Sequence, residues 1–116
     1  MNDNIIECVE IHRHDLTVKF GKYFHKFHDT NNTLQRADLM QKCKKIQSKM
    51  QHMFNVLKEK LISKEHEYKK ISYKYGREGR KKFGRLQNEI LYIRNLFYVL
   101  HLNLKEIDRH IVYMKK

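Results

Sequence analysis

The chain has 116 residues, a length typical of one domain, with 41% hydrophobic and 33% charged residues. Its 25 lysines and arginines against 13 acidic residues give a formal net charge of +12. The length excludes a barrel enzyme or a two-lobed kinase, and the absence of proline together with only four glycines argues against a disordered tail. The two cysteines do not form a disulfide scaffold. We therefore treat residues 1–116 as a single domain.

The first predicted helix covers residues 4–28 and has the least regular apolar spacing of the three. Its core-facing candidates are Ile5, Val9, His12, Leu16, Phe20, Tyr23 or Phe24, and Phe27. Asp3 is a candidate N-cap, and Gly21 costs about 1 kcal/mol relative to alanine inside a helix. The polar cluster at residues 29–33 predicts a turn.

The second predicted helix covers residues 33–75, and it contains no glycine or proline. Asn32 and Gln35 have the spacing of a capping box at its start, and Gly76 suits the position just past its end. The helix shows heptad spacing that becomes irregular after Leu57, where Lys64 falls near a core position. The predicted core positions are Leu39, Cys43, Ile46, Met50, Met53, Leu57, Leu61, Tyr68 and Ile71.

The third predicted helix covers residues 80–115 and has the clearest pattern in the chain. Its apolar residues alternate in steps of four and three without a break, which is the heptad spacing of a coiled coil and not the period of two of a strand. We call these positions the heptad seam: Leu86, Ile90, Ile93, Phe97, Leu100, Leu104, Ile107, Ile111 and Met114.

The arrangement of the helices follows from their lengths. The short connection between the second and third helices predicts that they lie antiparallel. The first helix is too short to cover both of the others along their full length. We therefore expect an all-α fold, an elongated antiparallel three-helix bundle or coiled-coil hairpin with a two-helix extension. Residues 76–84 are either a turn or part of one continuous helix, and a continuous helix would make the protein a single rod.

The third helix is apolar on more than one side. Beside the seam it carries Leu91, Tyr92, Leu96, Val99, Leu102, Val112 and Tyr113. A two-stranded coiled coil needs only a narrow stripe, so a wider apolar surface is covered either by the monomer core or by a partner. We predict that Leu96, Val99, Leu102 and Tyr113 face a partner protein, either a second copy or a different chain.

The positive charge is concentrated in the second helix and at the hairpin tip. Residues 33–75 carry a net charge of +7 and residues 76–85 a net charge of +4. The predicted basic contact site consists of Arg77, Arg80, Lys81, Lys82 and Arg85. Such a surface suits nucleic-acid phosphates, an acidic protein or an anionic membrane surface, and a lysine-rich face also keeps a long helix soluble.

No sequence motif indicates catalysis or a cofactor. A zinc site assembled from Cys8, His12 and Cys43, with His14 or His52 as a fourth ligand, lacks the paired spacing of known zinc sites. Cysteines that act as small core residues explain Cys8 and Cys43 more simply. The chain has no phosphate-binding glycine loop and no nucleophile elbow. We therefore expect no enzyme activity, no metal, no cofactor and no small-molecule substrate.

These observations favour a non-enzymatic helical interaction module: an adaptor, assembly or regulatory subunit. The alternative is a nucleic-acid-binding protein that uses the basic second helix and the tip from Lys69 to Arg85 for phosphate contacts with little sequence preference. No apolar run approaches the roughly 20 residues that span a bilayer, and acidic residues interrupt the N-terminal apolar ones, unlike in a signal peptide. We expect an intracellular protein, cytoplasmic or nuclear.

Overall fold

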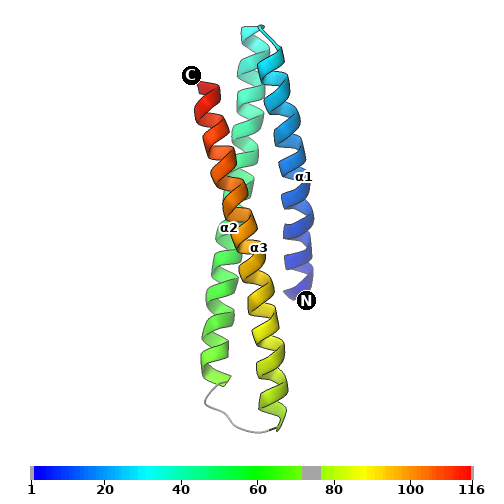
Figure 1. Cartoon of the computed structure of the whole chain (residues 1–116), viewed down its shortest axis with the longest axis vertical. Coiled ribbons are helices and arrows are strands. Elements are labelled where there is room, and N and C mark those ends of the chain that lie inside the picture. Colours follow the sequence, from blue (N-terminus) through cyan, green and yellow to red (C-terminus); the bar gives the residue numbers. More distant parts are fainter. Residues whose placement is uncertain (1, 72–76, 116) are drawn as a thin grey trace.

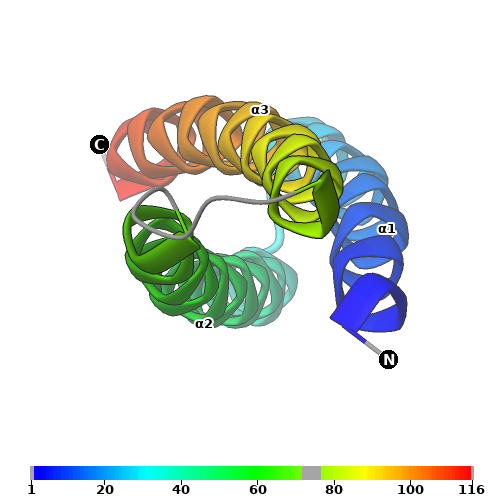
Figure 2. The same cartoon turned by 90° about the horizontal axis from the view of Figure 1, so that it is seen from below.

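The protein is an elongated bundle of three helices (Figure 1). A computed structural model describes the backbone of residues 2–71 and 77–115, and the side chains of residues 8–70 and 83–115. Helix α1 spans Asn2–Asp29, α2 spans Thr33–Ile71 and α3 spans Arg77–Lys115. Helix α2 runs antiparallel to both α1 and α3, and seen along the long axis the three helices surround a common centre (Figure 2). The predicted all-α antiparallel bundle is therefore confirmed.

The heptad seam of α3 forms one wall of the core. Every seam residue is buried except Phe97, which is half-buried. The ring of Phe97 stacks on Phe54 of α2, with 4.3 Å between the ring centroids. Because apolar side chains at heptad spacing leave water together, the seam is the principal source of the packing energy between α2 and α3.

Helix α2 contributes the opposite wall at its predicted positions. Cys43, Met50 and Leu57 are fully buried. Met53, Leu61 and Tyr68 are half-buried, which matches the looser pattern after Leu57, and the side chain of Ile71 lies outside the described residues. The Tyr68 ring stacks on Phe83 at 4.5 Å between centroids.

Helix α1 packs along the other two helices through Val9, Phe20 and Phe27, all buried. His12 does not take the core position predicted for it, because its side chain is exposed. At the connection to α2, Asn32 Oδ1 accepts hydrogen bonds from the backbone N–H groups of Leu34 at 3.0 Å and Gln35 at 3.2 Å. Asn32 is therefore the N-cap of α2, as predicted.

The capping box differs from the predicted one in its second half. Gln35 does not reach back to the Asn32 N–H. Instead, the Asn32 N–H donates to Thr30 Oγ1 at 3.3 Å, and this hydroxyl donates to Gln35 Oε1 at 2.8 Å.

The helix boundaries near the tip also differ from the prediction. Helix α3 begins at Arg77, so Gly79 and Gly84 are helical residues and not turn glycines. Residues 72–76, including Gly76, lie outside the described residues. Because α2 and α3 pack side by side, the single-rod alternative is wrong.

The bundle measures 66 × 21 × 15 Å, and its radius of gyration of 18.9 Å exceeds the roughly 13 Å of a compact chain of this length. The α2–α3 hairpin extends beyond the N-terminal end of α1 (Figure 1), as the lengths of the helices predict. The accessible surface of 8865 Å² is correspondingly larger than the roughly 6800 Å² of a compact protein of this mass. A rod of this kind exposes helix faces that a globule would cover.

Candidate interaction surface on helix α3

The solvent-facing side of α3 carries a second set of apolar residues. Leu91, Tyr98 and Leu102 are 50%, 62% and 44% exposed and follow a heptad-like spacing opposite the seam. Tyr92 and Val99 lie beside them and are 46% and 38% exposed. We call these five residues the outer apolar stripe.

The centre of the outer apolar stripe is free of charge. No charged residue occurs between Arg94 and Lys105, an interval that contains Tyr98, Val99 and Leu102. Loss of charged residues and enrichment in tyrosine characterise the buried centres of protein interfaces. The stripe therefore has the composition of an interface core on a surface that the described residues of the monomer leave open.

The four predicted interface residues do not lie together. Val99 and Leu102 lie in the stripe. Leu96 is only 7% exposed and belongs to the hydrophobic core, so the prediction that it faces a partner is wrong. Its position on the helix places it next to the seam, toward the other helices.

Tyr113 is exposed but separate from the stripe. It lies about 16 Å further along α3 than Leu102, at 1.5 Å per residue. Its ring packs against His28 of α1, with 5.3 Å between the ring centroids. Tyr113 therefore closes the end of the α1–α3 contact, and it does not extend the stripe.

Tyr98 is the most exposed residue of the stripe, and the interface prediction missed it. The signal was present in the sequence as the spacing from Leu91 to Tyr98 to Leu102. It becomes visible once the seam positions of α3 are set aside and the remaining apolar residues are read as a pattern of their own.

Polar contacts to the neighbouring helices border the stripe. On one side, Tyr92 Oη donates a 2.5 Å hydrogen bond to Glu10 Oε2 of α1. On the other side, Arg94 Nη2 lies 2.8 Å from Glu65 Oε1 of α2. Because the buried heptad seam determines the rotation of α3, the stripe is presented as a preformed surface, and these exposed polar contacts form its rim.

The predicted basic contact site is described only in part. Arg85 is exposed on α3. Arg77, Arg80, Lys81 and Lys82 belong to the first turns of α3, but their side chains lie outside the described residues.

The cysteines occupy two different environments. Cys43 is fully buried between apolar side chains, and this burial raises the pKa of its thiol from 9.0 to about 11. Cys8 is exposed, so the expectation that both cysteines fill the core is confirmed for Cys43 alone. His12, His14 and His52 are exposed, and no cluster of three His, Cys, Asp or Glu residues forms within the described part of the chain. The structure therefore does not bring together the side chains considered as zinc ligands, which were Cys8, His12, Cys43, His14 and His52.

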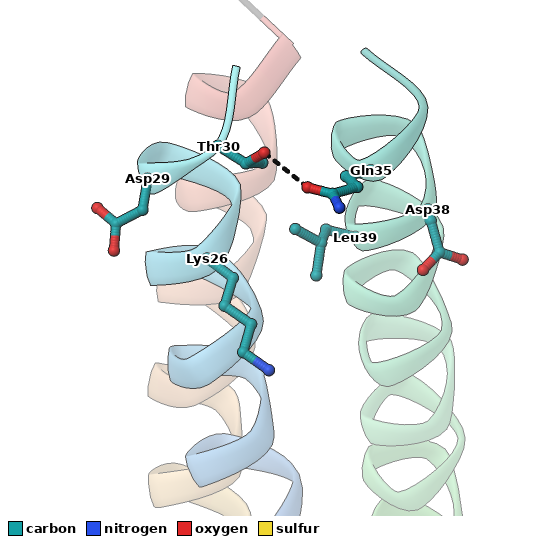
Figure 3. A pocket seen from close by; sticks show the side chains of 6 residues that line it. All are labelled: Lys26, Asp29, Thr30, Gln35, Asp38 and Leu39. Atoms are coloured by element: carbon teal, nitrogen blue, oxygen red, sulfur yellow. Dashed lines mark hydrogen bonds between the residues drawn. The ribbon is translucent and has the colours of Figure 1, made fainter. Parts of the chain in front are cut away.

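A polar hollow of about 380 Å³ lies where α1 passes into α2 (Figure 3). Its lining residues are Lys26, Asp29, Thr30, Gln35, Asp38 and Leu39. Substrate sites are mostly apolar and enclosed, whereas this hollow lies at the ends of two helices and is lined largely by polar side chains.

No family model, curated relative or solved structure matches this chain, so its function is inferred from its own residues. Within the described ranges 2–71 and 77–115, no helix is both long and apolar enough to cross a membrane.

Proposed function

We propose that the protein is a non-enzymatic interaction module that binds a partner helix along the outer apolar stripe of α3. The observation that supports this most is the uncharged, exposed surface around Tyr98, Val99 and Leu102 on a rigid helix. Tyrosine offers a large contact area at low entropic cost and is enriched among the residues that dominate binding energy. A role as adaptor, assembly or regulatory subunit fits such a surface.

The heptad-like spacing of the stripe favours a helical partner. An amphipathic helix can place its own apolar heptads against Leu91, Tyr98 and Leu102, while its flanks meet the polar rim. Transfer of apolar surface from water contributes about 25 cal/mol per Å², so a contact along several helical turns can offset the cost of association.

Charge favours an acidic partner over a second copy. The net charge of +12 makes two copies repel each other at low salt, whereas an acidic helix is attracted. Lys105 and Arg109, both exposed, follow the stripe along α3 and can meet carboxylates on such a helix.

Free Cys8 and Cys43 suit a reducing compartment, and we propose a cytoplasmic or nuclear location.

The test uses a synthetic helix of about four heptads with leucine at its core positions and glutamate at the flanking positions. Binding is measured by isothermal titration calorimetry to the wild type, to Val99→Asp/Leu102→Asp, and to the control Leu34→Asp/Ile62→Asp. The control places two aspartates at exposed apolar positions of α2, where Leu34 is 83% and Ile62 57% exposed.

We expect the double substitution on α3 to weaken binding at least tenfold more than the control. Equal loss in both variants, or no binding to the wild type, would contradict the proposal. Sedimentation of the wild type provides a second readout, because a stable dimer that the α3 variant dissociates would make the partner a second copy.

Nucleic-acid binding through the basic second helix and the tip, Lys69 to Arg85, remains a second proposal. It is supported by the exposure of Lys69, Lys70 and Arg85. If the tip makes phosphate contacts, replacing Arg80, Lys81, Lys82 and Arg85 with alanine should reduce the slope of log affinity against log salt by roughly 3.6, or 0.9 for each of four contacts. An unchanged slope would place the contacts elsewhere.

A further inference from the structure

A second surface, on the α1–α2 side of the bundle, is rich in positive charge, whereas the outer apolar stripe consists of uncharged residues. Residues 16–28 of α1 contain three lysines and no acidic residue. Residues 39–58 of α2 contain five lysines and no acidic residue. All eight lysines are exposed.

The antiparallel packing of α1 and α2 brings six of these lysines together. The Lys42 ammonium lies 5.5 Å from the centroid of the Tyr23 ring, and Lys26 shares the polar hollow with Leu39 (Figure 3). This register places Lys19 level with Ile46, between Lys45 and Lys49 along α2. We call the two sets the twin lysine rows: Lys19, Lys22 and Lys26 on α1, and Lys42, Lys45 and Lys49 on α2.

The protein itself neutralises these rows only in part, at the end where Asp29 and Asp38 line the hollow with Lys26. Lys42 pairs with Asp38 at 3.1 Å. Within the described residues, the other five lysines of the rows form no ion pair. Unpaired like charges at this density repel one another, and an anion that bridges them relieves this repulsion.

We propose that the twin lysine rows bind the phosphate backbone of double-stranded nucleic acid. Each row carries its three charges along about 10 Å of helix, and a duplex presents one phosphate per 3.4 Å on each strand. The flexible lysine stems adjust to this repeat, and ammonium groups act as point charges on phosphate oxygens.

The surroundings of the rows favour this partner over the other polyanions. Val18, 44% exposed, is the one exposed large apolar residue within residues 16–28, and none lies within residues 39–58. An acidic helix would therefore find little apolar contact here, and a membrane surface would receive at most one inserted side chain. The Tyr and Phe rings in these ranges, Phe20, Tyr23, Phe24, Phe27 and Phe54, are buried or half-buried, and the exposed rings are the smaller imidazoles of His25, His28 and His52, so large open stacking platforms for single-stranded bases are missing here. Contact between lysines and the phosphates of a duplex needs neither exposed apolar side chains nor stacking rings.

The experiment measures fluorescence anisotropy of a labelled duplex of about 20 base pairs at about 50 to 200 mM salt. The row variant is Lys19→Gln/Lys22→Gln/Lys45→Gln/Lys49→Gln. The control variant, Arg94→Gln/Lys105→Gln/Arg109→Gln/Lys115→Gln, removes the same number of exposed charges from α3, away from both the rows and the tip. Circular dichroism melts establish that both variants fold.

Six phosphate contacts predict a slope of about −5.4 for log affinity against log salt. The row variant removes four of these contacts, so its slope should be about −1.8. Affinity should fall roughly 10²- to 10³-fold at 100 mM salt in the row variant and far less in the control. If the row variant is destabilised, Lys45→Gln/Lys49→Gln alone should reduce the slope by about 1.8.

Equal losses in the two variants, or no duplex binding by the wild type, would overturn the proposal. So would displacement of the duplex by polyglutamate at equal charge, which would indicate an acidic protein. Row-dependent binding to vesicles containing phosphatidylserine, without duplex binding, would indicate a membrane. Leu102→Asp should leave duplex binding unchanged, so failure of the α3 proposal and failure of this one are distinguishable.

Discussion

The ammonium group of Lys64 on α2 lies 2.8 Å from Glu89 Oε2 on α3. The Lys64 side chain is only 14% exposed. This low exposure agrees with the heptad pattern, which places the lysine near a core position. The long apolar stem packs between the helices while the charged end reaches its carboxylate partner at the edge. This pair explains how the second helix tolerates a lysine where its seam becomes irregular.

Replacing Glu89 with glutamine should destabilise the protein by roughly 1–2 kcal/mol, because a neutral amide replaces the carboxylate beside the largely buried Lys64 ammonium. Urea unfolding followed by circular dichroism measures the change. The matched control is Asp38→Asn, which removes the exposed pair with Lys42 and should cost less than about 0.5 kcal/mol. Equal effects would mean that burial of Lys64 does not strengthen its pair.

Leu96 and Leu102 lie less than two turns apart on α3, but the same substitution should change the stability of the protein far more at Leu96 than at Leu102. Leu96→Ala should lower the unfolding free energy by about 2–5 kcal/mol, because it opens a cavity in the core. Leu102→Ala should change it by less than about 1 kcal/mol, because Leu102 is 44% exposed. Thermal melts of the two variants decide this, and comparable melting temperatures would show that the stripe is part of the folding core.

Gly21 lies within α1, and a methyl group added there would meet no atom within 4 Å apart from its chain neighbours and the adjacent backbone of its own helix. Gly21→Ala should therefore stabilise the protein by about 0.5–1 kcal/mol through helix propensity alone. The same holds for Gly84 in α3, which also faces open space. Urea midpoints for both variants measure the gain. A loss of stability at Gly21 alone would show that α1 needs a glycine for a reason other than packing.

The two thiols should react at very different rates. Cys8 is exposed and should be alkylated by iodoacetamide within minutes at pH 8. Cys43 should stay unmodified in the native protein, because it is buried and its raised pKa of about 11 leaves few thiolates. The folded state favours the neutral thiol of Cys43, so this group contributes fully to the free energy of unfolding below about pH 9. The contribution is lost as the pH rises toward 11. Mass spectrometry counts the modified sites, and two labels without denaturant would contradict the buried position of Cys43.

The heptad steps of the sequence determined the helices and the core. Because a 3.6-residue period brings every third or fourth side chain to one side, the spacing alone placed Ile93, Leu100 and Ile107 in the interior. Asn32 was recognisable as the cap for the same local reason, since its side chain bonds backbone groups only two and three residues away. Short-range geometry of this kind is written into the order of residues.

The tertiary structure decided which apolar residues remain on the surface. Leu96 and Val99 are both apolar residues outside the seam, yet Leu96 is 7% and Val99 38% exposed, because helix rotation and the positions of α1 and α2 determine which side is covered. The twin lysine rows likewise exist only because antiparallel packing brings Lys19 level with α2 residues that lie more than twenty positions away. Contacts between distant segments depend on the register of one helix against another, and the order of residues within a single helix does not contain that register.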